Sequence, residues 1–176
     1  SIALFDQNAE RVGRQVGGFE VQSFDLHQFS GGSAHICIGD NKIRGRVAAE
    51  LARLGCTLRT IIDPRAIVSA SARIGAGTFV AAGAIVSAHA AMGQCCIVNH
   101  ASVVDHECIL SDFVHIAPGA TLGGAVSIGP RTLIGAGANI LPRMSIANDV
   151  TIGAGAVLIE SATESAVYVG IPAKKV

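Results

Sequence analysis

Two histidines near the middle of the chain stand where an imidazole has no packing purpose. The stretch VVDHECILSDFVHIAPGA, residues 103–120, places His106 and His115 nine residues apart, with Glu107 directly after the first. Histidine is the most frequent general base in enzymes, and a nearby carboxylate favours the imidazolium and so strengthens that base. These residue types indicate proton-transfer chemistry, provided that the fold brings them to one surface.

The elements that must position these residues follow a period of six. Apolar residues recur about every 3.6 positions in an amphipathic helix and every two positions in a half-buried strand, whereas a recurrence every six positions fits a short strand plus a corner. Three such sides close a coil of eighteen residues, so we expect a parallel β-solenoid whose coils stack about 4.8 Å apart. The repeated aliphatic residues are Val68, Ile74, Val80, Val86, Met92, Val98, Val104, Leu110, Ile116, Leu122, Ile128, Ile134, Ile140, Ile146, Ile152 and Leu158.

Stacking at eighteen residues gives the first histidine a chemically useful neighbour. Gly124 lies eighteen positions after His106, so a glycine N–H is expected directly above the imidazole. A base and an oxyanion donor on one edge are what acyl transfer needs. Contact between His106 and Glu107 requires a corner there, and His115 is expected at a corner too. Cys108 occupies an inward position for small residues and is expected to be a core thiol, not a nucleophile.

Residues 1–62 lack the period and predict a separate unit, before a solenoid over 63–176. Asp6 and the run Gly39-Asp40-Asn41 end strands, where open α/β sheets bind ligands. No Gly-rich strand-to-helix turn precedes Ile2, so we expect an incomplete α/β unit without its first βα unit, with a sheet smaller than usual as the alternative. Strands are predicted over 2–6, 19–24, 34–39 and 57–63, with a helix over 41–55, which together favour a small parallel sheet.

Composition excludes several classes of partner. Thirteen basic and thirteen acidic residues cancel, and the longest basic run is Lys174-Lys175, so neither nucleic acid nor an anionic membrane is an expected partner. No apolar stretch is long enough for a membrane span. Five cysteines without CxxC spacing favour reduced thiols over a disulfide or zinc framework. We therefore expect a soluble cytoplasmic protein without a metal.

The stretch ASVVDHECILSDFVHIAPGATLGGAVSIG, with CIGDNKIR before it and the tail YVGIPAKK, resembles a known enzyme family. The family is the hexapeptide-repeat bacterial nucleotide-sugar acetyltransferases, typified by the bacillosamine-pathway N-acetyltransferase and related to the sialic acid O-acetyltransferases. The resemblance implies a mainly β fold, a left-handed parallel β-helix preceded by a small Rossmann-like α/β domain. It also implies a homotrimer with acetyl-CoA between neighbouring prisms and a nucleotide-linked amino sugar on the N-terminal domain.

The resemblance implies a role for individual residues as well. His106 would be the general base, Glu107 its acidic partner and Gly124 the oxyanion donor. The residues implied to contact acetyl-CoA are His115, Ala136, Ala154, Gly170, Pro172, Lys174 and Lys175. Those implied to bind the nucleotide sugar are Asp6, Gln7, Gly39, Asn41 and Asn99. The family usually shows two acids after the second strand, whereas Gln7 follows Asp6 here.

The expected reaction is direct N-acetylation of an amino sugar by acetyl-CoA, and three alternatives stay open. The acceptor could be a sugar or sialic acid hydroxyl instead of an amine. A trimeric β-helix could also be a zinc hydratase, with His100, His106 and His115 shared across an interface. The non-enzymatic alternative is a solenoid that serves only as a binding module.

Overall fold

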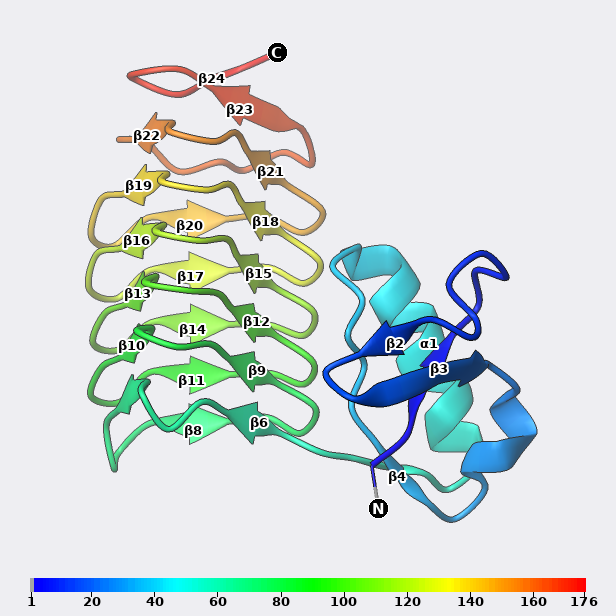
Figure 1. Cartoon of the computed structure of the whole chain (residues 1–176). Coiled ribbons are helices and arrows are strands. Elements are labelled where there is room, and N and C mark those ends of the chain that lie inside the picture. Colours follow the sequence, from blue (N-terminus) through cyan, green and yellow to red (C-terminus); the bar gives the residue numbers. More distant parts are fainter. Residues whose placement is uncertain (1) are drawn as a thin grey trace.

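The computed structural model describes residues 2–176, and most of them form a three-sided column of short strands (Figure 1). The first face contains β6 (Ile61–Ile62), β9 (Phe79–Val80), β12 (Ile97–Val98), β15 (His115–Ile116), β18 (Leu133–Ile134), β21 (Thr151–Ile152), β23 (Val167–Val169) and β24 (Lys174–Lys175). The second face contains β7 (Ile67–Val68), β10 (Ile85–Val86), β13 (Val103–Val104), β16 (Thr121–Leu122), β19 (Asn139–Ile140) and β22 (Val157–Leu158). The third contains β8 (Arg73–Ile74), β11 (Ala91–Met92), β14 (Ile109–Leu110), β17 (Ser127–Ile128) and β20 (Ser145–Ile146).

Strand register confirms that residues eighteen apart stack. Val103 pairs with Thr121 and His115 pairs with Leu133, in parallel, from one coil to the next. The second residue of each of these strands points inward, so Val104 and Ile116 are fully buried in the core. The small inward positions are filled as expected, because Cys96, Ser102 and Ala120, among others, have no exposed surface. The period of six is therefore the period of the column itself.

Corners join the faces, and many place a residue in the left-handed region. Glu107 has φ 59°, Ala125 φ 59° and Arg143 φ 64°, all at equivalent corners between the second and third faces. L-residues adopt this conformation at an energetic cost, which recurring turn hydrogen bonds compensate here. One of them runs from the Glu107 N–H to the Ala88 carbonyl of the coil below, at 2.9 Å.

The N-terminal part contains three small strands, a second strand pair and one helix. Strands β1 (Leu4–Asp6), β2 (Gln15–Val16) and β3 (Phe19–Ser23) form a sheet in the order β1-β3-β2, and the short 3-10 helix η1 (Leu26–Phe29) follows. Strand β4 (Ser33–Ala34) pairs with β5 (Thr57–Leu58). The helix α1 (Asn41–Arg53) begins at Asp40, whose carboxylate accepts a hydrogen bond from the Ile43 N–H.

Three expectations for this part are wrong. The sheet is mixed, because β2 runs antiparallel to β3 while β1 runs parallel to it. The strand expected over 34–39 ends at Ala34, and the carbonyls of Ile38 and Gly39 instead accept hydrogen bonds from an arginine. The strand expected over 57–63 is divided, because β6 leaves the N-terminal part and pairs with β9 of the column.

The N-terminal part and the column share a buried cluster. Ile36, Val47 and Leu51 pack together with Cys95, which belongs to a column corner, and Phe113 packs against them. The helix α1 thus docks on the column at the corners between its third and first faces (Figure 1). Among residues 2–176, no helix combines the length and apolar character that a membrane crossing requires.

Candidate active site

His106 lies on the corner between β13 and β14. The Asp105 carboxylate accepts a hydrogen bond from the His106 N–H at 2.7 Å, which fixes the start of the turn. Glu107 follows in the left-handed region, and its Oε2 lies 3.1 Å from Nδ1 of the imidazole. The corner therefore supplies the contact that a regular strand would forbid, because successive strand residues point to opposite faces.

Gly124 lies directly against the free edge of this imidazole. The Ala125 N–H donates to the His106 carbonyl at 2.8 Å and so fixes the next corner above the first. A Cβ added at Gly124 would overlap Nε2 and would lie 2.5 Å from Cε1 of His106. Among residues 2–176 the Gly124 N–H meets no hydrogen-bond acceptor. The predicted stacking of His106 and Gly124 is thus present, with the unbonded ring nitrogen Nε2 against the glycine.

This cluster is open to solvent on the single chain. The side chains of His106 and Glu107 are 57% and 63% exposed. Solvent therefore screens the electrostatic interaction between the imidazole and the carboxylate in the isolated chain. Cys108, two residues from the histidine, is fully buried, and its thiol donates to the Gly123 carbonyl at 3.2 Å. Burial raises the pKa of this thiol, so it is a core residue as expected.

His115 lies within β15 on the first face, so the prediction that it occupies a corner is wrong. The physical reason is that Ile116 is the inward residue of its repeat, and the residue before it is consequently an outward strand position. Its Nε2 lies 3.3 Å from the Asn99 side-chain nitrogen. Burial first, and then the charge of Arg44, lower the pKa of His115, while a hydrogen bond with the Gly39 backbone opposes them.

Ala136 and Ala154 lie at a different corner, between the first and second faces. Both are exposed, and the Gly155 N–H donates to the Ala136 carbonyl at 2.8 Å, so the two stack as their spacing predicts. His106 lies at the other edge of the second face. A single chain therefore presents two separate clusters, one around His106 and one that joins His115 to Asn99 and Gly39.

Solved structures with the same fold and substantial sequence identity show which family the chain belongs to. The acetyltransferase domain of PglB from Neisseria gonorrhoeae, in complex with acetyl coenzyme A, superposes with a TM-score of 0.93 at 36% identity, over 99% of this chain and 85% of that one. A variant of perosamine N-acetyltransferase from Caulobacter crescentus, in complex with CoA and GDP-perosamine, superposes with a TM-score of 0.90 at 34% identity. The match covers 95% of this chain and 81% of that one. The chain belongs to the hexapeptide-repeat nucleotide-sugar acetyltransferases. The expected fold, a left-handed parallel β-helix after a small α/β unit, is confirmed with this membership.

Curated sequences show a more limited similarity. A serine acetyltransferase from Mycobacterium tuberculosis is 41% identical over 71 residues, 36% of this chain and 31% of that protein. One from Staphylococcus aureus is 38% identical over 73 residues, 34% of its length. The chain thus spans about a third of the curated relatives that it matches. No family model matches the chain.

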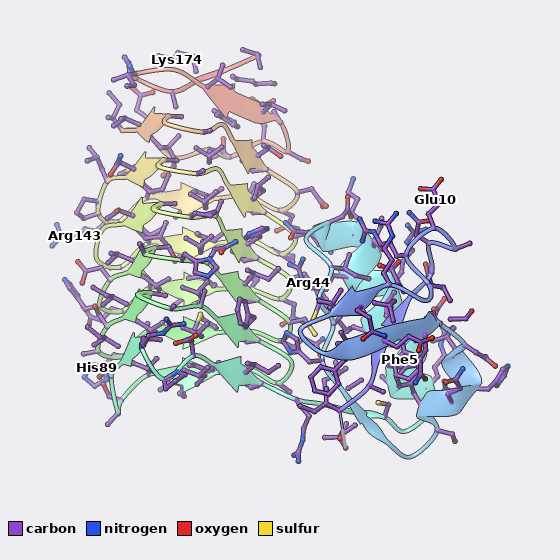
Figure 2. All side chains as sticks on the ribbon, viewed as in Figure 1. Phe5, Glu10, Arg44, His89, Arg143 and Lys174 are labelled. Carbon is purple, nitrogen blue, oxygen red and sulfur yellow. The ribbon has the colours of Figure 1, made fainter. Side chains whose placement is uncertain are left out.

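The C-terminal residues of this acetyltransferase-family chain close the end of the column. Strand β24 turns back antiparallel on β23, and the Gly170 carbonyl between them accepts a hydrogen bond from the Val157 N–H at 3.1 Å. Pro172 lies in the same turn. Lys174 Nζ lies 3.8 Å from Glu160 Oε2, and Lys175 Nζ lies 2.5 Å from Glu164 Oε2. The hydrogen bond with Glu164 raises the pKa of Lys175. Both lysines are exposed cations at the top of the column, as Figure 2 shows for Lys174.

The N-terminal residues expected at a nucleotide sugar have separate surroundings. Asp6 ends β1, accepts a hydrogen bond from the Asn8 N–H and pairs with Arg11, and both contacts lower the pKa of the Asp6 carboxyl. Gln7 follows it and is exposed. Asn41 instead donates to the carbonyls of Arg131 and Thr132 on the column, at 3.0 and 3.2 Å. A groove of about 300 Å³ opens beside Gly39 and Asn41.

The structure does not gather the three histidines of the hydratase alternative on one chain. His100 lies at the corner of Ala136, His106 at the next corner, and His115 in a strand of the first face. Within the described residues, no group of three or more His, Cys, Asp or Glu side chains could hold a metal ion.

Sequence reasoning missed one buried residue beside the second cluster, Arg44. Its signal is visible in the helix, because Arg44, Val47, Ala48 and Leu51 share one face and all four are buried. An arginine in line with three apolar core residues indicates a buried guanidinium that must find acceptors.

Proposed function

We propose that the chain transfers an acetyl group from acetyl-CoA to the amine of a nucleotide-linked amino sugar. The observation that carries this proposal is the Gly124 backbone against the imidazole of His106, with Glu107 on the opposite ring nitrogen. Two structural relatives support it: the perosamine N-acetyltransferase variant is bound to CoA and GDP-perosamine, and the PglB acetyltransferase domain is bound to acetyl coenzyme A.

The geometry fits direct transfer without an acyl-enzyme. The carboxylate of Glu107 holds the proton on Nδ1 of His106, which leaves the Nε2 lone pair for the attacking amine. As the amine nitrogen bonds to the thioester carbonyl carbon, Nε2 takes its proton and the Gly124 N–H stabilises the oxyanion. The C–S bond then breaks, and the CoA thiolate leaves and takes the proton from the imidazolium. A positioned base contributes about 10²- to 10⁴-fold, and one oxyanion donor about 10²- to 10³-fold.

The proposal includes a homotrimer in which two columns form each site. His106 and the corner of Ala136 and Ala154 lie at opposite edges of the second face, so a neighbouring copy could bring its alanine corner next to His106 of the first copy. Exposed aliphatic side chains on the outer faces favour such packing, since Ile67 is 65% and Ile109 56% exposed. In this assembly His115, Ala136, Ala154 and the tail residues Gly170, Pro172, Lys174 and Lys175 contact acetyl-CoA.

The N-terminal residues 1–62 are proposed to hold the nucleotide sugar. Asp6, Gln7, Gly39 and Asn41 belong to this part, and Asn99 contributes from the column. Support comes from the groove beside Gly39 and from the GDP-perosamine named for the Caulobacter relative. Because Asn41 already binds two column carbonyls, its contribution is to hold the loop at the groove.

The experiment measures turnover on a panel of acceptors. The purified chain is mixed with acetyl-CoA and GDP-, UDP- or CMP-linked sugars that carry an amine or only hydroxyls, while thiol release and product mass are followed. We expect acetylation of an amine, lowered by about 10²-fold or more in His106→Ala and unchanged in His27→Ala, where the exposed imidazole lies in η1. Acetylation of hydroxyl acceptors alone would contradict the proposed amine acceptor, and normal turnover by His106→Ala would contradict the proposed base. Sedimentation velocity tests the trimer separately.

A further inference from the structure

Arg44 is a buried cation that the proposed chemistry does not use. It lies on the inward face of α1 with 1% of its surface exposed, and its side chain reaches from the helix toward the column (Figure 2). Burying a guanidinium is costly unless its donors are satisfied. Among the described residues, Arg44 forms no salt bridge with a carboxylate. A charge kept in this position needs a structural explanation.

The guanidinium joins two parts of the chain through five hydrogen bonds. On the column it donates to the Cys95 carbonyl at 2.8 Å and to the Phe113 carbonyl at 2.9 Å. On the loop before α1 it donates to the Ile38 carbonyl at 2.8 Å, to the Gly39 carbonyl at 3.1 Å and to Asn41 Oδ1 at 2.7 Å. A rigid planar fork can hold this set of acceptors, whereas a lysine ammonium cannot reach all of them. Arg44 thus fixes loop 38–41 against the column.

The same loop contacts His115, whose protonation state follows from its neighbours. Asn99 Oδ1 accepts hydrogen bonds from the N–H and Nδ1 of His100, each at 2.9 Å, so the amide nitrogen of Asn99 points to His115. An amide nitrogen only donates, so Nε2 of His115 must be the acceptor. The proton of the neutral ring is then on Nδ1.

The charges around His115 agree with a neutral ring. Its strand neighbours Ile97 and Leu133 are apolar, and Arg44 approaches from the N-terminal side. His100 hydrogen-bonds to Asn99, which lies between it and His115. The charge of Asp40 raises the pKa of Arg44. Burial and the Arg44 charge both lower the pKa of His115.

We propose that Arg44 is a positioning residue, which holds loop 38–41 against the column for the nucleotide sugar and, through its charge, keeps the nearby His115 in the neutral form whose Nδ1–H tautomer Asn99 selects. The effect on sugar binding depends on the proposed function, whereas the effect on His115 does not. Arg44 touches neither reactant and acts through Gly39 and His115.

The test compares Arg44→Met, Arg44→Lys and the control Arg53→Met, which removes an exposed arginine of the same helix. We expect Arg44→Met to raise the KM for the nucleotide sugar and to lower kcat/KM for that substrate about 10²-fold, because a displacement of about 1 Å can reduce the rate by this factor. The KM for acetyl-CoA should change less than the KM for the sugar. In Arg44→Lys the KM for the sugar should rise too, because the fork is lost.

Titration of His115 by NMR separates positioning from a general loss of structure. Arg44→Met should raise the pKa of His115, while Arg44→Lys, which keeps the charge, should leave it low. Equal changes in both KM values, or a His115 pKa unchanged in Arg44→Met, would overturn the inference. If wild type shows no turnover, the proposed function fails while the titration still decides the role of Arg44. Should the methionine variant not fold, the ¹⁵N shifts of wild-type His115 decide, because protonation at Nε2 of the neutral ring contradicts the proposal.

Discussion

The substitution Gly124→Ala tests the stacking of the two corners most directly. It adds one methyl group at a buried backbone position next to the imidazole of His106. The methyl carbon would overlap Nε2 and would lie 2.5 Å from Cε1 and 3.1 Å from Cδ2 of the ring. No backbone atom is among these nearest neighbours, so the ring has to move.

The required movement sets the expected size of the effect. Carbon atoms in ordinary contact are about 3.5 Å or more apart, so the ring edge must retreat by about 1 Å from the added carbon, given 2.5 Å to Cε1. A displacement of about 1 Å at a reacting group costs about 10²-fold in rate. Stability should change little, because the imidazole is a mobile side chain with 57% of its surface exposed. We therefore expect a large loss of kcat with a nearly unchanged melting temperature.

The assay combines steady-state kinetics, calorimetry and a double-mutant cycle. Thiol release from acetyl-CoA gives kcat for wild type, Gly124→Ala, His106→Ala and the double variant. If Gly124→Ala acts by displacing the ring, it should have almost no effect once the ring is absent, so the two losses should be far from additive. Acetyl-CoA binding by calorimetric titration should stay close to the wild-type value in Gly124→Ala.

Three results would refute this reasoning. Wild-type turnover in Gly124→Ala would show that the histidine does not act from the position that the structure gives it. Fully additive losses in the double variant would show that Gly124 matters for another reason, such as folding of the corner. A melting temperature lowered in parallel with kcat would point to the same explanation.

Three further predictions concern charge and burial. Glu107→Gln should keep a hydrogen bond to the imidazole but lose its charge, so kcat should fall about tenfold or more, and a kcat equal to wild type would contradict a role for the carboxylate. With Ellman's reagent, Cys37 should react first and more slowly than a free thiol, because burial around its sulfur raises its pKa. Cys96, whose pKa burial raises to about 12, should react only after unfolding, and early labelling of it by mass spectrometry would contradict the core assignment. The pKa of Asp63 is lowered to about 2 from 3.8 by its hydrogen bonds with Arg65, so the pair stabilises the fold above about pH 4 and this contribution is lost as the pH falls toward 2. The difference in melting temperature between wild type and Asp63→Asn should follow that window in calorimetry.

The column could be predicted because its register depends on a single spacing. Once an inward aliphatic residue recurs at every sixth position, hydrogen bonding between coils fixes which residues stack, and the pairing of Val103 with Thr121 follows. Gly124 above His106 is part of the same register. The spacing also predicts that Cys108 is inward. The stacking residues of each pair lie eighteen positions apart in the sequence but in adjacent coils, so the repeat alone is sufficient to predict which residues stack.

The position of His115 shows where the period alone was insufficient. The repeat length predicts how often a corner occurs but not which residue begins it. A corner at His115 is therefore wrong by part of a repeat, since His115 lies in β15. The inward residue Ile116 fixes the phase, because the residue before an inward strand position points outward from the same strand. With that phase, His115 faces the N-terminal part and Asn99.

The N-terminal part was less predictable because side chains, not a repeat, determine its path. Ile38 and Gly39 were expected in a strand, yet their carbonyls bind the guanidinium of Arg44. Short apolar runs do not reveal whether their backbone groups will pair with a strand or with a side chain.

Within the second cluster, Arg44 lies between loop 38–41 and the column strand that carries His115. Loop 38–41 would contact the sugar, and His115 on the same first face is proposed to contact acetyl-CoA. Since the guanidinium binds Phe113 and Cys95 on the column as well as Gly39, the loop cannot move from the column without breaking several charge-assisted hydrogen bonds. Released carbonyls and a buried guanidinium would then lack partners, which is more costly than the loss of an exposed contact. If the proposed function holds, Arg44 would therefore keep the loop proposed for the sugar and the histidine proposed for the coenzyme in a fixed arrangement without touching either ligand.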